Sequence, residues 1–188
     1  MDTNGFGRCV IFVDNSNIFK NMKRDARIDW IKLISYLKDL GLNIWDKWFF
    51  IGESAEPRES QNRFLEMLAD YGFNIVQLQL KKRTITCPGC GENRQIYVEK
   101  GVDVAITTHM LKFLYNNAYD TAILISGDGD LSGVAQEIRR YGRKVIVISF
   151  REAMSGSLDQ VSNKTIYLDD IAEKVKLERN AEYENTSV

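Results

Sequence analysis

Two hydrophobic periods alternate along this chain, one typical of strands and one typical of helices. Short, nearly continuous apolar runs at residues 9–13, 47–52, 73–80, 121–126 and 144–150 predict buried β-strands. Apolar residues at helical spacing predict helices at residues 30–40, 57–71, 103–115 and 130–141. Asp29 is a candidate N-cap for the first of these helices, and Gly41, Gly72 and Gly142 directly follow three of them. The chain therefore alternates strand and helix for most of its length.

This alternation predicts the α/β class. We expect a three-layer α/β/α sandwich around a Rossmann-like parallel sheet of about five strands, in the order 3-2-1-4-5. One domain is expected over residues 1–176, with a weaker pair of helices after residue 150 and a polar tail at residues 177–188. Residues 81–100 break the rhythm because they are polar and contain a Cys-x-x-Cys motif. We expect an inserted hairpin or loop there.

Acidic side chains follow two of the predicted strands. Asp14 ends the first strand, and Asp128 and Asp130 follow the fourth, with Gly129 between them allowing a tight turn. In the order 3-2-1-4-5 the first and fourth strands are neighbours whose connections leave in opposite directions, so a crevice opens at their carboxyl ends. Asp103 opens the helix that leads to the fourth strand, and its end of that helix lies near the same edge. The sequence therefore predicts that these four carboxylates converge.

Several carboxylates in one crevice repel one another unless a cation is bound. Mg²⁺ or Mn²⁺ prefers such oxygen ligands, and Asn17 could add a carbonyl ligand or hold a phosphate oxygen. Each residue also has a structural explanation. Asp103 suits a helix start, Asp130 could be an N-cap, and Asp14 with Asn17 could tie down a loop. Their joint position favours a metal site over these separate roles.

Composition narrows the chemistry. The formal net charge of −1 means that any contact with nucleic acid must come from local basic patches. No apolar run is long enough to span a bilayer and no signal peptide is evident, so we expect a cytoplasmic protein without a membrane partner. The single histidine, His109, lies within a predicted helix, which argues against histidine-rich zinc sites and nucleophilic triads. Carboxylates remain as the candidate catalytic groups.

Three segments, IFVDNSNIF, EKGVDVAITTHML and ILISGDGDLSGVAQEIRRYGRKVIVIS, together resemble the NYN domain in its LabA-like bacterial branch, part of the PIN-like nuclease superfamily. The resemblance covers about residues 8–150. It implies a PIN-like sandwich and a Mg²⁺ or Mn²⁺ site that hydrolyses RNA. By position, Asp14 and Asn17 match the family's first motif, Asp103 its second, and Asp128 and Asp130 its last. The resemblance thus implies that the four aspartates are catalytic and bind the metal.

Basic residues near these motifs are candidates for binding RNA. Single-stranded RNA is the expected form. Lys20, Lys23, Arg24 and Arg27 follow the first motif and are expected on the crevice rim, with Ser16 beside Asn17. Lys81, Lys82 and Arg83 are expected to leave the third strand on the same face, and Lys100 precedes the second motif. Phe19 and Tyr97 could stack on bases. The structural alternative is a solvated charged surface with Phe19 in the core.

Cys87 and Cys90 have the spacing of a zinc half-site. A complete site needs two more ligands, and neither Cys9 in the first strand nor His109 is an evident partner. Two chains could complete a four-thiolate Zn²⁺ site across a homodimer. A reduced loop without metal is the other interpretation, and a thioredoxin-like pair would need to open a helix.

These observations favour a metal-dependent ribonuclease that hydrolyses RNA phosphodiesters. The alternative is a regulatory module that binds RNA or protein with little or no catalysis, although binding alone does not require a repulsive acidic cluster. Three other sites fit poorly. A metal-dependent adhesion site wants serine where Ile18 stands, a phospho-aspartate phosphatase wants aspartate where Ser16 stands, and dinucleotide binding wants a glycine-rich turn after the first strand.

Overall fold

A six-stranded parallel sheet forms the centre of the molecule. The computed structural model describes residues 5–22, 27–53, 59–98 and 100–178. The strands are β1 (Arg8–Asp14), β2 (Asn43–Glu53), β3 (Asn74–Gln79), β6 (Thr121–Ile125), β7 (Lys144–Ser149) and β8 (Lys164–Tyr167). Their order is β3-β2-β1-β6-β7-β8, and every neighbouring pair is parallel. The predicted α/β class and the order 3-2-1-4-5 are confirmed, with β6 and β7 as the fourth and fifth strands.

The strand β8 extends the sheet beyond the prediction. Sequence patterning places only helices after residue 150, whereas β8 pairs with β7 from Ile146↔Lys164 to Ser149↔Tyr167. The flanking helices are short: α6 (Gly156–Gln160) and α7 (Leu168–Val175), preceded by the 3-10 turn η2 (Arg151–Ala153). A strand of four residues with one buried position carries too little periodicity to be recognised.

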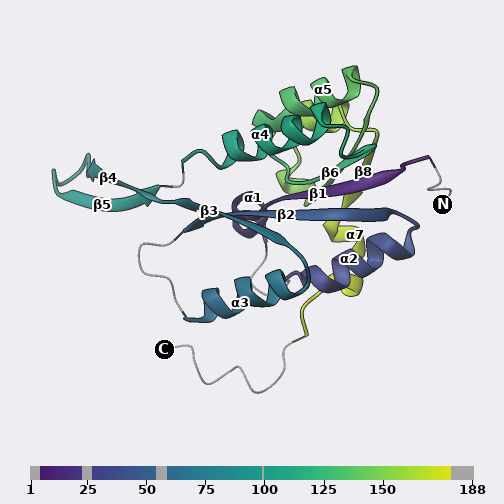
Figure 1. Ribbon diagram of the computed structural model, residues 1–188. Helices are drawn as coiled ribbons and strands as arrows, with labels where there is room; N and C mark the ends of the chain where they lie inside the picture. The colour runs from purple at the N-terminus through teal and green to yellow at the C-terminus, as the bar shows by residue number, and fades with distance from the viewer. Residues whose placement is uncertain (1–4, 23–26, 54–58, 99, 179–188) are drawn as a thin grey trace.

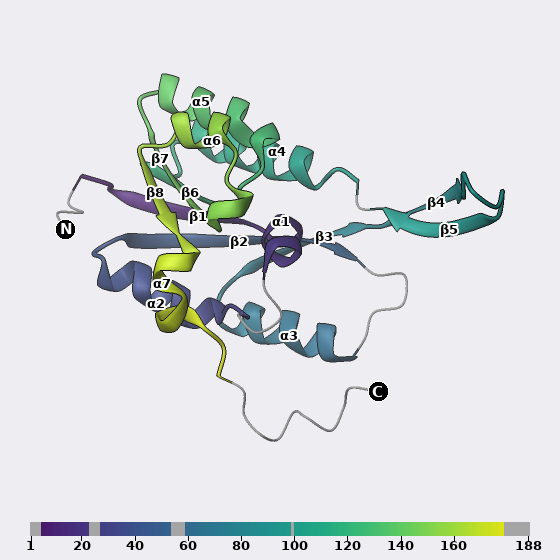
Figure 2. The same ribbon diagram turned by 180° about the vertical axis from the view of Figure 1, so that it is seen from behind.

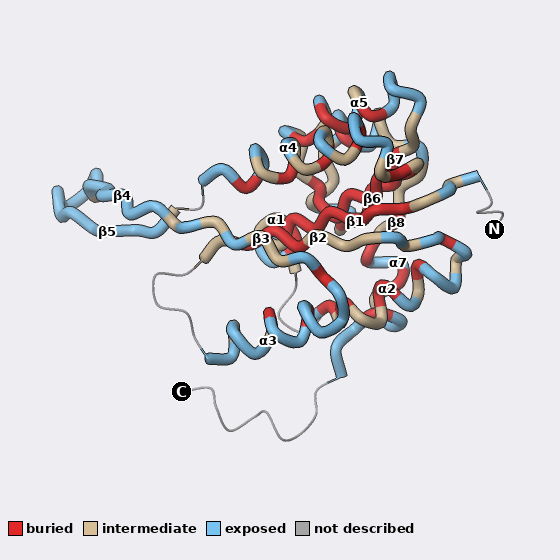
Figure 3. The backbone as a smooth tube through the Cα atoms, viewed as in Figure 1, coloured by how far each residue is buried: buried red, intermediate tan, exposed pale blue. Residues whose placement is uncertain are grey.

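Helices cover both faces of the sheet, as Figures 1 and 2 show. On one face lie α2 (Trp30–Asp39), α3 (Glu59–Asp70) and α7, and on the other lie α4 (Val102–Tyr115), α5 (Ser132–Arg140) and α6. Alternate residues of β1 pack against opposite helix layers. Ile11 and Val13 lie in the core beneath α2, α3 and α7, and Val10 and Phe12 lie in the core beneath α4, α5 and α6. The central strands are therefore buried on both sides (Figure 3).

Helix ends follow the local sequence. The Asp29 carboxylate accepts hydrogen bonds from the backbone N–H groups of Ile31 and Lys32, which confirms it as the N-cap of α2. Gly41, Gly72 and Gly142 take φ values of +81°, +77° and +76°, as a left-handed turn after a helix requires. The predicted start of the second helix, residues 57 and 58, lies outside the described residues.

The insert forms a hairpin that projects from the body. Strands β4 (Lys81–Thr86) and β5 (Asn93–Val98) pair antiparallel in a sheet of their own, which continues directly from β3. Every residue of β4 and all of β5 except Val98 are exposed. The hairpin, here called the arm, extends from the same edge of the molecule at which α4 begins (Figures 1 and 2). Of the predicted tail, residues 179–188 lie outside the described residues.

No helix within the described ranges is both long and apolar enough to cross a membrane.

Candidate metal centre

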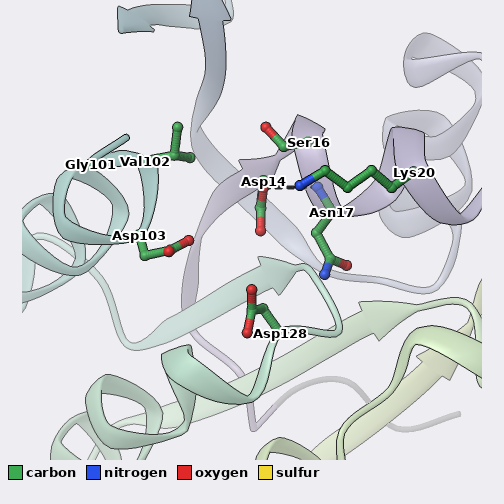
Figure 4. A pocket seen from close by; sticks show the side chains of 8 residues that line it. All are labelled: Asp14, Ser16, Asn17, Lys20, Gly101, Val102, Asp103 and Asp128. Atoms are coloured by element: carbon green, nitrogen blue, oxygen red, sulfur yellow. Dashed lines mark hydrogen bonds between the residues drawn. The ribbon is translucent and has the colours of Figure 1, made fainter. Parts of the chain in front are cut away.

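Three carboxylates from distant parts of the chain meet at the carboxyl edge of the sheet. Asp14 ends β1, Asp103 lies in the first turn of α4, and Asp128 follows β6. One ligand oxygen from each lies within 4.8 Å of the other two. The three side chains line a pocket of about 130 Å³, together with Ser16, Asn17, Lys20, Gly101 and Val102 (Figure 4). The direct pairing of β1 with β6 creates this convergence, as the predicted strand order requires.

Asp14 is the buried member of the cluster. It is only 2% exposed, whereas Asp128 is half-buried and Asp103 is exposed. One oxygen of Asp14 accepts a hydrogen bond from the backbone N–H of Asn17 at 3.1 Å, so Asp14 is the N-cap of a short helix, α1 (Asn15–Asn21). The other oxygen accepts from the hydroxyl of Ser126 at 2.9 Å. Both bonds hold the carboxylate in one orientation toward the pocket.

Ser126 connects two of the acids, a role that the sequence analysis missed. Its fully buried hydroxyl donates to Asp14 and accepts from the backbone N–H of Asp128 at 3.1 Å. Asp128 in turn accepts from the backbone N–H of Asp130 at 3.0 Å. A serine placed between an apolar strand and the first acid of the Gly-Asp-Gly-Asp turn was the available signal. Hydrogen bonds to ligand carboxylates of this kind fix their orientation.

Asn17 joins α1 to the turn after β6. Its side-chain oxygen accepts a hydrogen bond from the backbone N–H of Gly127 at 2.9 Å, across 110 positions of sequence. Gly127 has no room for a side chain, because a Cβ there would lie 2.2 Å from the carbonyl oxygen of Ala153. The backbone oxygen of Gly127 accepts from the N–H of Ser155 at 2.9 Å. The acidic turn is thus held from both sides.

Burial and like charge make the pocket unfavourable for anionic groups alone. Burial raises the pKa of Asp14, and the charges of Asp103 and Asp128 raise it further, while the hydrogen bonds from Asn17 and Ser126 act in the opposite direction. A divalent cation would offset this repulsion. The donors present are carboxylate oxygens, which suit Mg²⁺ or Mn²⁺, and no histidine or cysteine lines the pocket.

Comparison with known proteins identifies the family. The model of the NYN domain matches residues 8–169. The chain belongs to the NYN domain family. This confirms the resemblance seen in the sequence and places the chain in the PIN-like nuclease superfamily.

Individual relatives are distant. The low amplitude and bright protein LabA of Synechococcus elongatus is 21% identical over 166 residues, covering 87% of this chain and 85% of LabA. A crystal structure of a Vibrio parahaemolyticus protein of unknown function is 22% identical. The two structures superpose with a TM-score of 0.68, and the alignment covers 94% of this chain and 100% of the Vibrio chain. At this identity the structural likeness supports the sandwich fold alone.

Not every predicted residue of the NYN domain reaches the pocket. Ser16, Asn17 and Lys20 line it, as expected. Asp130 is exposed in the 3-10 turn η1 (Gly129–Leu131), outside both the pocket lining and the group of three carboxylates. The structural alternative for Asp130, an N-cap, is wrong, since Leu131 precedes α5 and Asp128 caps η1.

The remaining basic residues lie elsewhere. Lys100 is exposed just before α4 and does not line the pocket. Arg27 lies beside α7 rather than on the rim, because its backbone oxygen accepts from Leu177 and it lines a small apolar pocket with Leu168. Lys23 and Arg24 fall outside the described residues. Among the described residues of the expected basic rim, Lys20 lines the pocket and Arg27 does not.

The basic run of the arm divides between two faces. In the β4–β5 register, Lys81 pairs with Val98 and Arg83 with Ile96, and all four lie on one face of the hairpin. Lys82 pairs with Tyr97 on the other face, where its ammonium lies 5.6 Å from the ring centre. The register thus separates Lys82 from Lys81 and Arg83, and the expectation that the three lie on the same face as the crevice rim stays a prediction. Phe19 also differs from its structural alternative, since its 66% exposure excludes a core position.

Proposed function

We propose that this NYN domain is a metal-dependent ribonuclease that hydrolyses RNA phosphodiesters at the cluster of Asp14, Asp103 and Asp128. The observation that carries the proposal is the meeting of these three carboxylates, from three separate elements, in one open pocket. A binding surface for RNA needs cations and has no use for a buried acid whose ionised form is disfavoured. Membership of a family that typically has nuclease activity supports the same conclusion.

The pocket residues have distinct roles in this proposal. Asp14, Asp103 and Asp128 hold Mg²⁺ or Mn²⁺, which supplies stabilisation of the negative charge that develops on the phosphodiester. Ser126 keeps Asp14 and Asp128 in register through its two hydrogen bonds. Lys20 lines the pocket and is placed to neutralise a phosphate oxygen. Ser16 and Asn17 flank the same opening.

Asp130 acts from the rim in this proposal. Its backbone N–H already orients Asp128, and that contribution does not depend on its side chain. Its exposed carboxylate assists through solvent rather than as a direct ligand. Replacement of Asp130 by Asn should therefore cost less activity than replacement of Asp128.

The features around the pocket favour single-stranded RNA as substrate. Phe19 is 66% exposed one position before Lys20, so a base unstacked from its neighbours can rest on the ring while its phosphate meets the ammonium. Four exposed cations outside the pocket would neutralise further phosphates of the same strand: Lys100 and, on the arm, Lys81, Lys82 and Arg83. We place this activity in the cytoplasm, where the thiols of the chain remain reduced.

The test is cleavage of a labelled single-stranded RNA by the purified full-length chain with Mg²⁺ or Mn²⁺. Asp128→Asn should lower the rate about a hundredfold or more, because a bound cation contributes several kcal/mol to the reaction barrier. Chelator should abolish cleavage, and excess Mn²⁺ should restore it. Asp70→Asn, at an exposed aspartate near the end of α3, is the matched control and should cleave at the original rate.

Two results would contradict the proposal. Equal cleavage by the wild-type chain and Asp128→Asn would assign the activity to a contaminant. Tight RNA binding with no cleavage in any metal would favour the alternative, a regulatory module without catalysis.

A further inference from the structure

The tip of the arm holds two free cysteines that lie apart from the carboxylate pocket. Cys87 follows β4 and Cys90 lies three residues later, within the turn that joins β4 to β5. Both are free thiols, Cys90 exposed and Cys87 half-buried. The arm carries them away from the sandwich, and the pocket lining contains neither (Figure 1). The carboxylate site does not use them.

The turn is shaped around the sulfur of Cys87. The backbones of Cys90 and Gly89 and the side chain of Cys90 lie within hydrogen-bond reach of the sulfur of Cys87. The same contacts place the two thiols side by side. The backbone closes tightly: the N–H of Cys87 donates to Glu92 and the N–H of Gly91 donates to Cys87, both at 2.9 Å. Gly91 has φ of +71°, which a side chain would strain.

Such a turn suits zinc better than it suits a redox pair. A tight Cys-x-x-Cys turn that holds two free thiols has the ligand spacing of structural Zn²⁺ sites. A redox-active pair of this spacing gains its reactivity from opening a helix, and here the second cysteine leads into the strand β5. The turn therefore offers two sulfur atoms at the spacing of one half of a zinc site.

No other soft ligand of this chain can complete the site. The sequence contains one further cysteine and one histidine. Cys9 is fully buried in β1. His109 lies in α4, where its Nδ1–H donates to the carbonyl oxygen of Ala105 at 2.8 Å and its ring packs 5.0 Å from that of Trp48. Among the described residues, the three aspartates are the only cluster of three or more metal-type ligands.

We propose that Zn²⁺ binds between the arm tips of two copies of this chain, where Cys87 and Cys90 of each copy complete a tetrahedral four-thiolate site. Structural zinc sites have four protein ligands, with Zn–S distances of about 2.3 Å. A twofold axis through the ion brings the same pair from a second copy, so the site is closed without any new residue. Each thiol releases its proton to solvent on ligation, and the metal keeps its oxidation state.

The structure of the arm explains why contact between two copies would depend on the zinc ion. An isolated two-stranded hairpin has marginal stability in water, and this one packs no face on the core. Only the tips need to approach one another, and so small a contact cannot hold two chains together without the ion. The inference is independent of RNA cleavage, because no residue of the carboxylate pocket takes part.

The experiment is a zinc titration of the metal-free, reduced, full-length chain, followed by light scattering and by metal analysis of the separated species. We expect one zinc ion per two chains and a doubled mass that returns to that of the monomer with chelator. Co²⁺ in place of Zn²⁺ should show the absorption of a tetrahedral thiolate site. Asp14→Asn should retain all of these properties, which separates this site from the carboxylate pocket.

The Cys87→Ser/Cys90→Ser double variant should remain monomeric with zinc and lose the Co²⁺ absorption. Its circular dichroism should match that of the wild-type chain, because the tip lies outside the core. Cys9→Ala is the matched control that removes a thiol elsewhere, and it should still dimerise. One zinc per monomer, zinc-independent dimerisation, a disulfide between Cys87 and Cys90 in the titrated sample, or no zinc binding would each overturn the proposal.

Discussion

The carboxylate pocket and the arm tip obtain their geometry in opposite ways. The pocket collects Asp14, Asp103 and Asp128 from positions far apart in sequence, and the buried pairing of β1 with β6 holds them together. The tip collects Cys87 and Cys90 from a single turn, and nothing in the core supports it. A site of the first kind can be complete within one chain. A local turn of the second kind presents two ligands and needs its remaining ligands from outside.

The difference also decides what a substitution does. Around the pocket, a changed side chain disturbs buried hydrogen bonds and close backbone contacts, so stability and chemistry change together. On the arm, residues face solvent, so a change should alter binding and leave the sandwich intact. Paired variants, one in each region, should therefore behave differently.

Among the variants that compare the two regions, Ser126→Ala should have the largest effect on activity. The variant removes the hydroxyl that bonds both Asp14 and the N–H of Asp128, so Mn²⁺ affinity and cleavage should each fall about 10- to 100-fold. Calorimetric titration with Mn²⁺ and the RNA cleavage assay measure the two losses. The arm variant Thr86→Ala, which removes an exposed side-chain hydrogen bond to Asn93, should change neither. Unchanged Mn²⁺ affinity in Ser126→Ala would show that the acids are oriented without it.

Two glycines give the second contrast. Gly127→Ala places a methyl group against the carbonyl of Ala153, so the free energy of unfolding should fall by about 3 kcal/mol or more. Gly91→Ala meets no atom within 4 Å and carries only the strain of a positive φ, about 1–2 kcal/mol confined to the turn. Urea denaturation followed by tryptophan fluorescence should therefore shift strongly for Gly127→Ala and little for Gly91→Ala. Equal shifts would mean that the arm and the sandwich unfold as one unit.

A smaller effect is expected from charges on the two faces of the arm. Lys81→Gln/Arg83→Gln removes two cations from one face and should flatten the salt dependence of RNA binding by about 0.7 for each phosphate that is no longer neutralised. Lys82→Gln removes one cation from the other face, where the ammonium lies over Tyr97. This variant should flatten the salt dependence of RNA binding less than the double variant does. Binding measured over a range of salt concentrations tests both. An unchanged slope in the double variant would remove the arm from the RNA path.

The smallest effect concerns pH. The unfolded Asp14 carboxyl ionises near its ordinary pKa of 3.8, and burial raises its pKa in the folded chain. Asp14 therefore contributes stability that is fully present below pH 3.8 and is lost as pH rises through the folded pKa. The Asn side chain in Asp14→Asn does not titrate. In the presence of chelator, the stability of this variant relative to wild type should therefore rise slightly as pH increases from 3.8 through the folded pKa of Asp14. Urea midpoints at a series of pH values test this, and a constant difference would contradict it.

Much of the scaffold could be predicted because its signals are local or periodic. Apolar runs at β1, β6 and β7 gave the strand order, and Asp29 and the three glycines gave the helix ends. The helix α1 could not be recognised, because seven largely polar residues show no apolar face and only the cap by Asp14 reveals it. The strand β8 also could not be recognised from the sequence, because its hydrophobic pattern spans only four residues.

Within the site, the sequence could place the acids at one edge but not choose among them. Asp128 and Asp130 look equivalent in Gly-Asp-Gly-Asp. The backbone hydrogen bond between them settles their roles, because Asp128 caps the 3-10 turn and Asp130 becomes part of it. The position of Ser126 before the acidic turn is a local signal, but its hydrogen bond reaches a partner 112 positions away, which the local pattern does not identify.

The hydrogen bonds from Ser126 to Asp14 and from Gly127 to Asn17 also bear on the order of synthesis. Each joins the first motif to the last, across 112 and 110 positions. Chains are made from the N-terminus at about 5–20 residues per second, so Asp14 emerges several seconds before its partners. A nascent chain that ends before residue 126 keeps the local bond from Asn17 to Asp14 but lacks both the Ser126 hydroxyl and Asp128. The cluster therefore forms only when synthesis is well advanced, and under the proposed function an unfinished chain still attached to its own messenger RNA cannot cut it.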